Sequence, residues 1–148
     1  RMPVLKKLFA KIAFVRFARA AATLLEGGVS LLATLSQSRT VMRHPFLEQI
    51  IADAEEKVAE GKPLSSCFEN QPLIPPLIPR MLGISEQSGK LSFTMQQIAQ
   101  IYEEELESTL TQFANLAQPV LLLFLGALVG FVLLSVLLPL TDVSSFVN

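Results

Sequence analysis

The sequence contains few of the side chains on which catalysis and metal binding usually depend. Its 148 residues include one cysteine, Cys67, one histidine, His44, and no tryptophan. A single cysteine cannot form a disulfide within the chain, and no group of His, Cys, Asp and Glu has the spacing of metal ligands. His44 precedes Pro45, and Cys67 lies in the helix-like run PLSSCFE, so we expect a loop histidine and a buried thiol rather than a nucleophile pair. The sequence predicts a protein that is not an enzyme and that uses no cofactor and no metal.

Charge is also missing from particular segments. No acidic residue precedes Glu26, and no charged residue lies between Glu107 and Asp142. The net charge of −1 does not indicate nucleic-acid binding, so we expect none. The first segment is basic, and with Phe9, Phe14 and Phe17 it fits either an anionic lipid surface or a partly solvated helix. Its six lysines and arginines, of twelve in the chain, are Arg1, Lys6, Lys7, Lys11, Arg16 and Arg19.

The uncharged segment contains the longest apolar run of the chain, PVLLLFLGALVGFVLLSVLLPL, at residues 119–140. About 21 helical residues extend roughly 32 Å, which matches a bilayer core of about 30 Å. We therefore predict a transmembrane helix, and we expect Pro139 to stop or kink its last turn. Gly126 and Gly130 form a GxxxG pair that another helix can approach closely, so we expect helix–helix packing in the membrane and a homo-oligomer.

The distribution of positive charge predicts an orientation. Every lysine and arginine precedes the apolar run, and the tail TDVSSFVN has none. Because cytoplasmic flanks of membrane spans are enriched in Lys and Arg, we expect residues 1–118 to form a cytoplasmic domain. Residues 141–148 would then be a short tail on the other side of the membrane.

The domain before the span is predicted to be all-α. Apolar positions recur every three or four residues from Leu91 to Ala117, no Gly or Pro interrupts them until Pro119, and nothing alternates as in a strand. We therefore expect one long helix that continues from the domain into the span, restarted or kinked at Gln118-Pro119. Shorter helices precede it, with stops at Gly27-Gly28 and Gly61 and a start at Pro45. The expected fold is an antiparallel bundle of about six helices.

The polar side of the long helix carries an acidic cluster. Such a cluster is typical of a solvated helix face, and the functional alternative is a surface for a basic partner. Its members are Glu103, Glu104, Glu105 and Glu107.

The stretch GISEQSGKL, residues 83–91, has letters in common with a nucleotide-binding loop. A P-loop requires four residues between Gly and Gly-Lys, followed by Ser or Thr, whereas here five residues intervene and Leu91 follows. We predict instead a joint between two helices, with Gly89 in the left-handed conformation that closes the first and Leu91 beginning the second. Glu86 is expected to accept hydrogen bonds from N–H groups at the start of the second helix, and Lys90 to be solvated.

Several motifs, taken in order, resemble the type II secretion F domain, the family of GspF and PilC inner-membrane proteins. FARAAATLLEGGVSLLATL, residues 17–35, has the family's Phe-x-Arg, Leu-Leu pair and Gly-Val turn. EGKPLSSCF, PPLIPRML, SEQSGKL and the apolar run follow in the family's order, so the resemblance covers essentially the whole chain. The first-helix motif consists of Phe17, Arg19, Leu24, Leu25 and Gly28, and the joint motif of Glu86, Ser88, Gly89 and Leu91.

Two positions depart from the family pattern. Ser85 stands where the family usually has a glycine before the glutamate of the joint, and Gln118 stands where a glutamate often precedes the proline of the span. A role of that second glutamate is therefore not carried over to this chain.

The resemblance implies a non-catalytic part of the inner-membrane platform of a bacterial type II secretion system or type IV pilus assembly machine. Its implied partners are a secretion or pilus assembly ATPase, pilin-like subunits, other inner-membrane platform proteins and membrane lipid. The family has two such helical domains and three spans, so this chain resembles the second domain and the last span. The alternatives are an unrelated tail-anchored adaptor and a membrane-bound hydrolase that uses His44, Cys67 or the acidic cluster.

Overall fold

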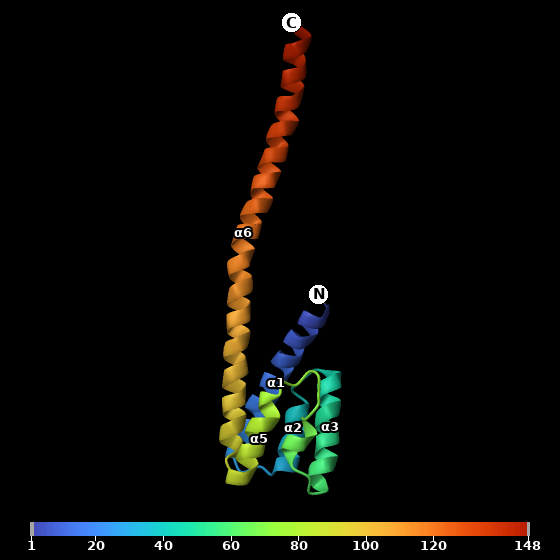
Figure 1. The fold of residues 1–148 in the computed structure, drawn as a ribbon, viewed down its shortest axis with the longest axis vertical. Helices are drawn as coiled ribbons and strands as arrows, with labels where there is room; N and C mark the ends of the chain where they lie inside the picture. Colours follow the sequence, from blue (N-terminus) through green and yellow to red (C-terminus); the bar gives the residue numbers. More distant parts are fainter. Residues whose placement is uncertain (1, 148) are drawn as a thin grey trace. The chain divides into compact units, whose positions relative to one another are not determined.

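All regular secondary structure in the described part of the chain is helical, as predicted. A computed structural model describes the backbone of residues 2–147 and the side chains of residues 4–142. Within this range there are six helices and no strand, and the chain divides into two compact units, residues 1–107 and residues 108–148 (Figure 1). The helices are α1 (Met2–Glu26), α2 (Leu31–Arg39), α3 (Pro45–Ala59), α4 (Leu64–Cys67), α5 (Leu77–Ser88) and α6 (Leu91–Val147).

The expected helix ends are confirmed at the glycines. Gly28, after α1, has φ +87°, a backbone conformation that glycine adopts without steric cost. The N–H groups of Gly28 and Val29 donate to the carbonyls of Leu25 and Leu24, both at 3.0 Å, so the last turn of α1 keeps its hydrogen bonds. Gly61 follows α3 in the same way. Chain reversal therefore occurs where the sequence predicts it.

The single histidine begins a helix. His44 is the N-cap of α3, and its Nδ1 accepts a hydrogen bond of 3.2 Å from the backbone N–H of Leu47. Pro45 occupies the first helical position, where its missing N–H and its fixed φ are no disadvantage. The expected loop histidine is thus a helix cap.

The core of the first unit is built on one face of α1. Five buried alanines (Ala10, Ala13, Ala18, Ala21 and Ala22) keep that face narrow, and Phe14 and Phe17 fill the space between them. The Phe14 ring lies 5.5 Å from the ring of Phe17 and 5.8 Å, edge-on, from the ring of Phe68. The interpretation that places Phe14 and Phe17 at a lipid surface is therefore wrong, because both rings are buried; of the three phenylalanines only Phe9 is exposed.

The first turns of α6 belong to the same core. Met95, Ile98, Ala99 and Tyr102 are buried, and Leu106 packs against them from a partly exposed position. Their spacing of three and four residues is the helical stripe that the sequence predicts.

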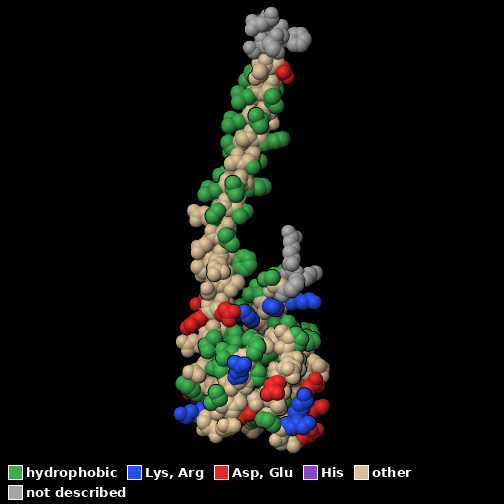
Figure 2. Space-filling view, in the orientation of Figure 1, with side chains coloured by type: hydrophobic (Ala, Val, Ile, Leu, Met, Phe, Trp, Pro, Cys, Tyr) green, Lys and Arg blue, Asp and Glu red, His purple; other side chains and the backbone are tan. Residues whose placement is uncertain are grey.

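The second unit is the remainder of α6. Every large hydrophobic side chain described there is exposed, from 50% at Val129 to 75% at Leu123, and Figure 2 shows them along its visible surface. The hydroxyls of Ser135 and Thr141 donate to carbonyls one turn earlier, so they need no partner outside the helix. This long, apolar helix meets the length and composition of a membrane span, with a mean hydropathy of 2.9 over its most apolar window.

Neither proline of this unit ends the helix. Pro119 and Pro139 both lie inside α6, which continues to Val147, so the expected stop at Pro139 is not observed. A proline removes one backbone hydrogen bond, but its fixed φ is compatible with helical backbone. In the predicted tail, residues 141–148, the side chains from residue 143 onward lie outside the described residues.

Candidate functional site

The joint between α5 and α6 has the predicted form. Gly89 has φ +73° and ψ +18°, and the N–H of Lys90 donates to the carbonyl of Ser85 at 3.2 Å, which closes α5. Leu91 begins α6 and is partly buried, whereas the Lys90 side chain is exposed. The Ser88 hydroxyl donates within α5, to the carbonyls of Ile84 and Ser85. The stretch joins two helices, so the helix-joint interpretation is confirmed.

Glu86 accepts hydrogen bonds at the start of a helix, but this helix is α4 and not the expected α6. Its Oε1 accepts a hydrogen bond of 2.9 Å from the backbone N–H of Ser65, and its Oε2 one of 3.1 Å from the Ser65 hydroxyl. Ser65 lies in the first turn of α4, 21 residues earlier, and not in α6. Pro63, the N-cap of α4, makes no side-chain cap, so the N–H needs an acceptor from elsewhere. Glu86 therefore ties α5 to α4.

Ser85 is accommodated by a bond within its own helix. Its side chain is buried, and its hydroxyl donates to the carbonyl of Leu82 at 2.9 Å. The departure from the family pattern therefore leaves no unsatisfied donor at this position.

Two of the four glutamates in the acidic cluster form ion pairs within the first unit. Glu103 forms an ion pair with Arg19, and Glu105 forms one with Lys11. Because the two pairs run in opposite residue order, α1 and the first turns of α6 are antiparallel. Both glutamates keep exposed side chains, so the acidic face is solvated as expected, and at these two positions it also forms ion pairs with α1.

The other half of the acidic cluster lies at the surface. Glu104 and Glu107 are both exposed. Glu104 accepts a hydrogen bond of 3.5 Å from the Gln100 side chain of its own helix.

The first-helix motif has a structural role. Phe17 is fully buried in the core, and Arg19 makes the ion pair to α6. Leu24 and Leu25 are partly buried, and their carbonyls accept the hydrogen bonds that close α1 at Gly28. These residues dock α1 and reverse the chain.

The two residues considered as a nucleophile pair have other roles. The Cys67 thiol is buried in α4 and contacts the carbonyl of Pro63 at 3.7 Å, while His44 caps α3. Burial raises the pKa of the Cys67 thiol above its ordinary value, because the thiolate would lose its hydration. A raised pKa makes the thiol less reactive at neutral pH. Within the described part of the chain no three His, Cys, Asp or Glu side chains are placed to hold a metal ion.

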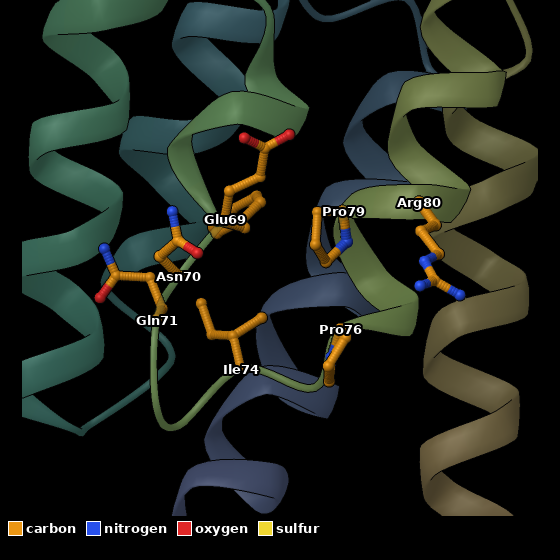
Figure 3. Close-up of a pocket in the computed structure, with 8 residues that line it drawn as sticks. Glu69, Asn70, Gln71, Ile74, Pro76, Pro79 and Arg80 are labelled. Atoms are coloured by element: carbon orange, nitrogen blue, oxygen red, sulfur yellow. The ribbon is translucent and has the colours of Figure 1, made fainter.

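A cavity of about 400 Å³ lies between the end of α4 and the start of α5 (Figure 3). Asn70 and Gln71 approach it from the connecting loop, and Pro79 from α5. Glu69 and Arg80 point away from one another on opposite sides. The cavity offers amide groups and apolar walls, but no nucleophile beside a base.

The GxxxG glycines are accessible from outside the chain. A Cβ atom added at Gly126 or at Gly130 would meet no other atom within 4 Å. A larger side chain at either position therefore causes no clash within the chain itself.

Three of these contacts are not predicted by the sequence. Ser65 pairs with Glu86, and the signal for it was Pro63, a helix start without its own capping side chain. The ion pairs of Lys11 and Arg19 were signalled only by the opposite charge of the two segments. The positive φ of Asn70, +61°, had no signal beyond the residue type, since asparagine tolerates this conformation better than most residues.

These features define a class: an all-helical chain with six helices in its described part, of which α6 begins in a packed domain and continues as an exposed apolar helix. Residues 17–139 match the family model of type II secretion system (T2SS), protein F. The chain belongs to this family, as its motifs predicted. It is thus related to components of type II secretion and type IV pilus assembly machines.

Individual relatives come from both kinds of machine. The chain is 33% identical over 146 residues to the type 4 fimbrial assembly protein PilC of Pseudomonas putida, and the aligned region covers 99% of this chain and 36% of that protein. It is 31% identical over 148 residues to the type II secretion system protein F of Xanthomonas campestris pv. campestris, covering 100% and 36%. It is 30% identical over 141 residues to the type IV pilus assembly protein PilC of Thermus thermophilus, covering 95% and 35%. The chain spans about a third of the length of these relatives.

Proposed function

We propose that this chain is a non-catalytic part of the inner-membrane platform of a type II secretion or type IV pilus assembly machine. In this role it couples a cytoplasmic assembly ATPase to pilin-like subunits and to other platform proteins in the membrane. The observation that carries the proposal is α6, whose residues Met95, Ile98 and Tyr102 are core residues of the helical domain, while the same helix continues as an apolar span. The backbone of α6 stays helical from one to the other, although Pro119 removes one hydrogen bond of the ladder, and an unbroken helical backbone is a direct mechanical connection.

The test interrupts that connection. A flexible glycine-serine linker is inserted after Gln118 in the full-length protein, and secretion or piliation is measured together with the membrane-bound amount of the protein. We expect loss of secretion or piliation with unchanged insertion. The matched control carries the same linker between Gly61 and Lys62, in the exposed turn after α3, and should stay active. Normal function of the Gln118 variant would overturn the coupling proposal.

The proposed topology places residues 1–118 in the cytoplasm, residues 119–140 in the bacterial inner membrane and residues 141–148 in the periplasm. The positive charges before the span support it. The test uses two fusions after Asn148. One carries alkaline phosphatase, which is active only outside the cytoplasm, and the other a fluorescent protein, which matures only inside it. We expect an active phosphatase and a non-fluorescent fusion. An inactive phosphatase and a fluorescent fusion would mean that the chain has the opposite topology.

Gly126 and Gly130 are proposed to pack against a second transmembrane helix in a homo-oligomer. Because an added Cβ at either position meets nothing within the chain, a loss caused by Gly126→Ile or Gly130→Ile reports on a partner. Cross-linking in membranes should show less oligomer for both variants. Ser135→Ile, which lies on the opposite face of the helix from both glycines, is the control and should leave the oligomer unchanged.

Glu104 and Glu107 are proposed as the part of the acidic cluster that meets a basic partner, because the other two glutamates are in ion pairs with α1. Charge reversal, Glu104→Lys with Glu107→Lys, should weaken co-purification of the ATPase or of another platform protein. Unchanged co-purification of every component would remove this surface from the proposal.

A further inference from the structure

A groove lies between the N-terminal half of α1 and the loop from α2 to α3. Its volume is about 490 Å³. Helix α1 contributes Lys6, Phe9 and Arg16, and the loop contributes Arg43 and His44. In Figure 2 the exposed N-terminal turns of α1 carry Lys and Arg side chains beside hydrophobic ones.

The lining of this groove is positively charged and not neutralised. It includes three cations, Lys6, Arg16 and Arg43, and no acidic side chain. Among the described residues none of the three has an ion pair, whereas Lys11 and Arg19 of the same helix pair with glutamates of α6. Cations that converge without a counter-charge favour an anionic occupant.

The loop side of the groove is held by local structure. Arg43 has φ +53°, a left-handed conformation that is uncommon for a residue with a side chain. It lies between the turn that ends α2, where the N–H of Met42 donates to the carbonyl of Arg39 at 3.2 Å, and the cap at His44. Because Nδ1 of His44 accepts the N–H of Leu47, the ring that borders the groove is fixed as well. The backbone thus positions Arg43 beside α1.

Exposed apolar side chains adjoin these cations: Phe9 lines the same groove, and Leu5 and Phe46 are sequence neighbours of lining residues. Phe9 is 58% exposed, Leu5 48%, and Phe46, which follows the groove-lining Pro45 in the chain, 51%. A free inorganic anion would bind the cations but would not account for the exposure of these apolar side chains. A lipid bilayer offers both environments, because its acidic headgroups lie directly above the acyl chains.

The length of the connection to the span favours lipid over a soluble acidic protein. Residues 108–118 separate the first unit from the predicted span, and even fully extended they reach only about 40 Å. If α6 spans the membrane as proposed above, the first unit remains close to the bilayer surface. The effective concentration of headgroups there exceeds that of any dissolved partner.

We propose that this groove binds the headgroups of acidic phospholipids in the bilayer that holds α6, with Phe9 entering the interface between headgroups and acyl chains. The bound chemistry is a phosphodiester anion presented at an apolar surface. The proposal rests on the membrane location of α6, but not on which side of the membrane the domain lies.

The absence of tryptophan from the chain allows a direct test. The Phe9→Trp variant of the full chain is reconstituted in nanodiscs of phosphatidylcholine alone or with phosphatidylglycerol, and bromine-labelled acyl chains serve as quencher. We expect a blue shift and quenching of the tryptophan only in the discs that contain phosphatidylglycerol. The matched control is Phe93→Trp in α6, where the native side chain is 56% exposed, and its emission should be the same in both lipids.

The cations are tested in the Phe9→Trp background. The substitutions Lys6→Gln, Arg16→Gln and Arg43→Gln, each on an exposed side chain, should weaken the association about fivefold each, as expected for single basic residues at an anionic surface. About 1 M salt, with a Debye length near 3 Å, should abolish the lipid dependence. Circular dichroism and thermal unfolding check that each variant is folded.

Three outcomes would overturn the proposal. They are equal emission of Phe9→Trp in both lipids, equal quenching of Phe9→Trp and Phe93→Trp, and lipid dependence that survives removal of all three cations in a folded protein. Extraction of the wild-type chain by carbonate is measured in parallel. Extraction would refute the membrane span itself, while a retained chain with no lipid dependence would refute only the groove.

Discussion

The two parts of α6 have the same backbone geometry and opposite surroundings. Before Glu107 the buried apolar residues form one stripe, which contains Ile98, while Ile101, three residues later, lies outside it and is 40% exposed. From Pro119 to Leu140 apolar residues cover the helix on all sides, and every large one is exposed. A periodic stripe is what a helix needs to pack on one side of a domain, and a uniform apolar surface is what it needs inside lipid. One helix therefore carries two sequence patterns, each suited to a different solvent.

The largest effect is expected from charge in the apolar part. Leu128→Arg with Val132→Arg should prevent stable membrane insertion, because each arginine near the centre of a span costs about 2.5–3.5 kcal/mol. The measurement is the membrane fraction after carbonate extraction. Ile84→Arg with Phe93→Arg, at exposed apolar positions of the domain, should stay in the membrane; loss of both variants alike would remove the contrast between the two parts.

A buried position in the first part should cost nearly as much. Ile98→Ala is expected to lower the free energy of unfolding of the helical domain by about 2–5 kcal/mol, because it leaves a cavity in the core. Urea unfolding followed by circular dichroism measures it. Ile101→Ala makes the same chemical change one turn away at a half-exposed position and should have a much smaller effect. Equal losses would mean that burial does not separate the two residues.

The Glu86 tie should matter less than the core. Glu86→Ala leaves the N–H and hydroxyl of Ser65 without their acceptor, and we expect a loss of about 1–3 kcal/mol in the same assay. Combined with Ser65→Ala it should show non-additivity, since the two residues form one contact. Additive losses would contradict the pairing.

The smallest effects are expected from the ion pairs between α1 and α6. All four side chains are partly exposed, so Glu103→Gln and Glu105→Gln should each cost less than about 1 kcal/mol, and high salt should reduce the difference. Glu107→Gln is the control and should be neutral. A loss as large as that of Ile98→Ala would mean that charge, and not the apolar stripe, holds this part of α6 to the domain.

Local signals predicted most of the helix boundaries. Gly28, Gly61 and Gly89 close helices, and Pro45 opens one, because these residues have backbone preferences that neighbouring residues do not override. The all-α class and the apolar stripe of α6 followed from periodicity in the same way.

The candidate site could be predicted only in part. The predicted helix joint at Gly89 is confirmed, whereas the predicted hydrogen-bond partner of Glu86 is wrong. A carboxylate can accept from any donor within reach, and only the packing of α4 against α5 brings Ser65 close. The burial of Phe14 and Phe17 was missed for a similar reason. Phenylalanine suits a lipid surface and a protein core equally well, and the sequence does not indicate which surface each ring meets.

The sequence by itself determined the properties that depend on neighbouring residues: the helical class, the turns at the glycines, the apolar run and the motifs of the family. The tertiary structure alone decided the properties that depend on distant residues. It joined Glu86 to Ser65, paired Lys11 and Arg19 with glutamates of α6, and left Lys6, Arg16 and Arg43 facing one groove. The physical reason is range: backbone preferences act within a few residues, whereas charge pairing and burial depend on which helices come to lie side by side.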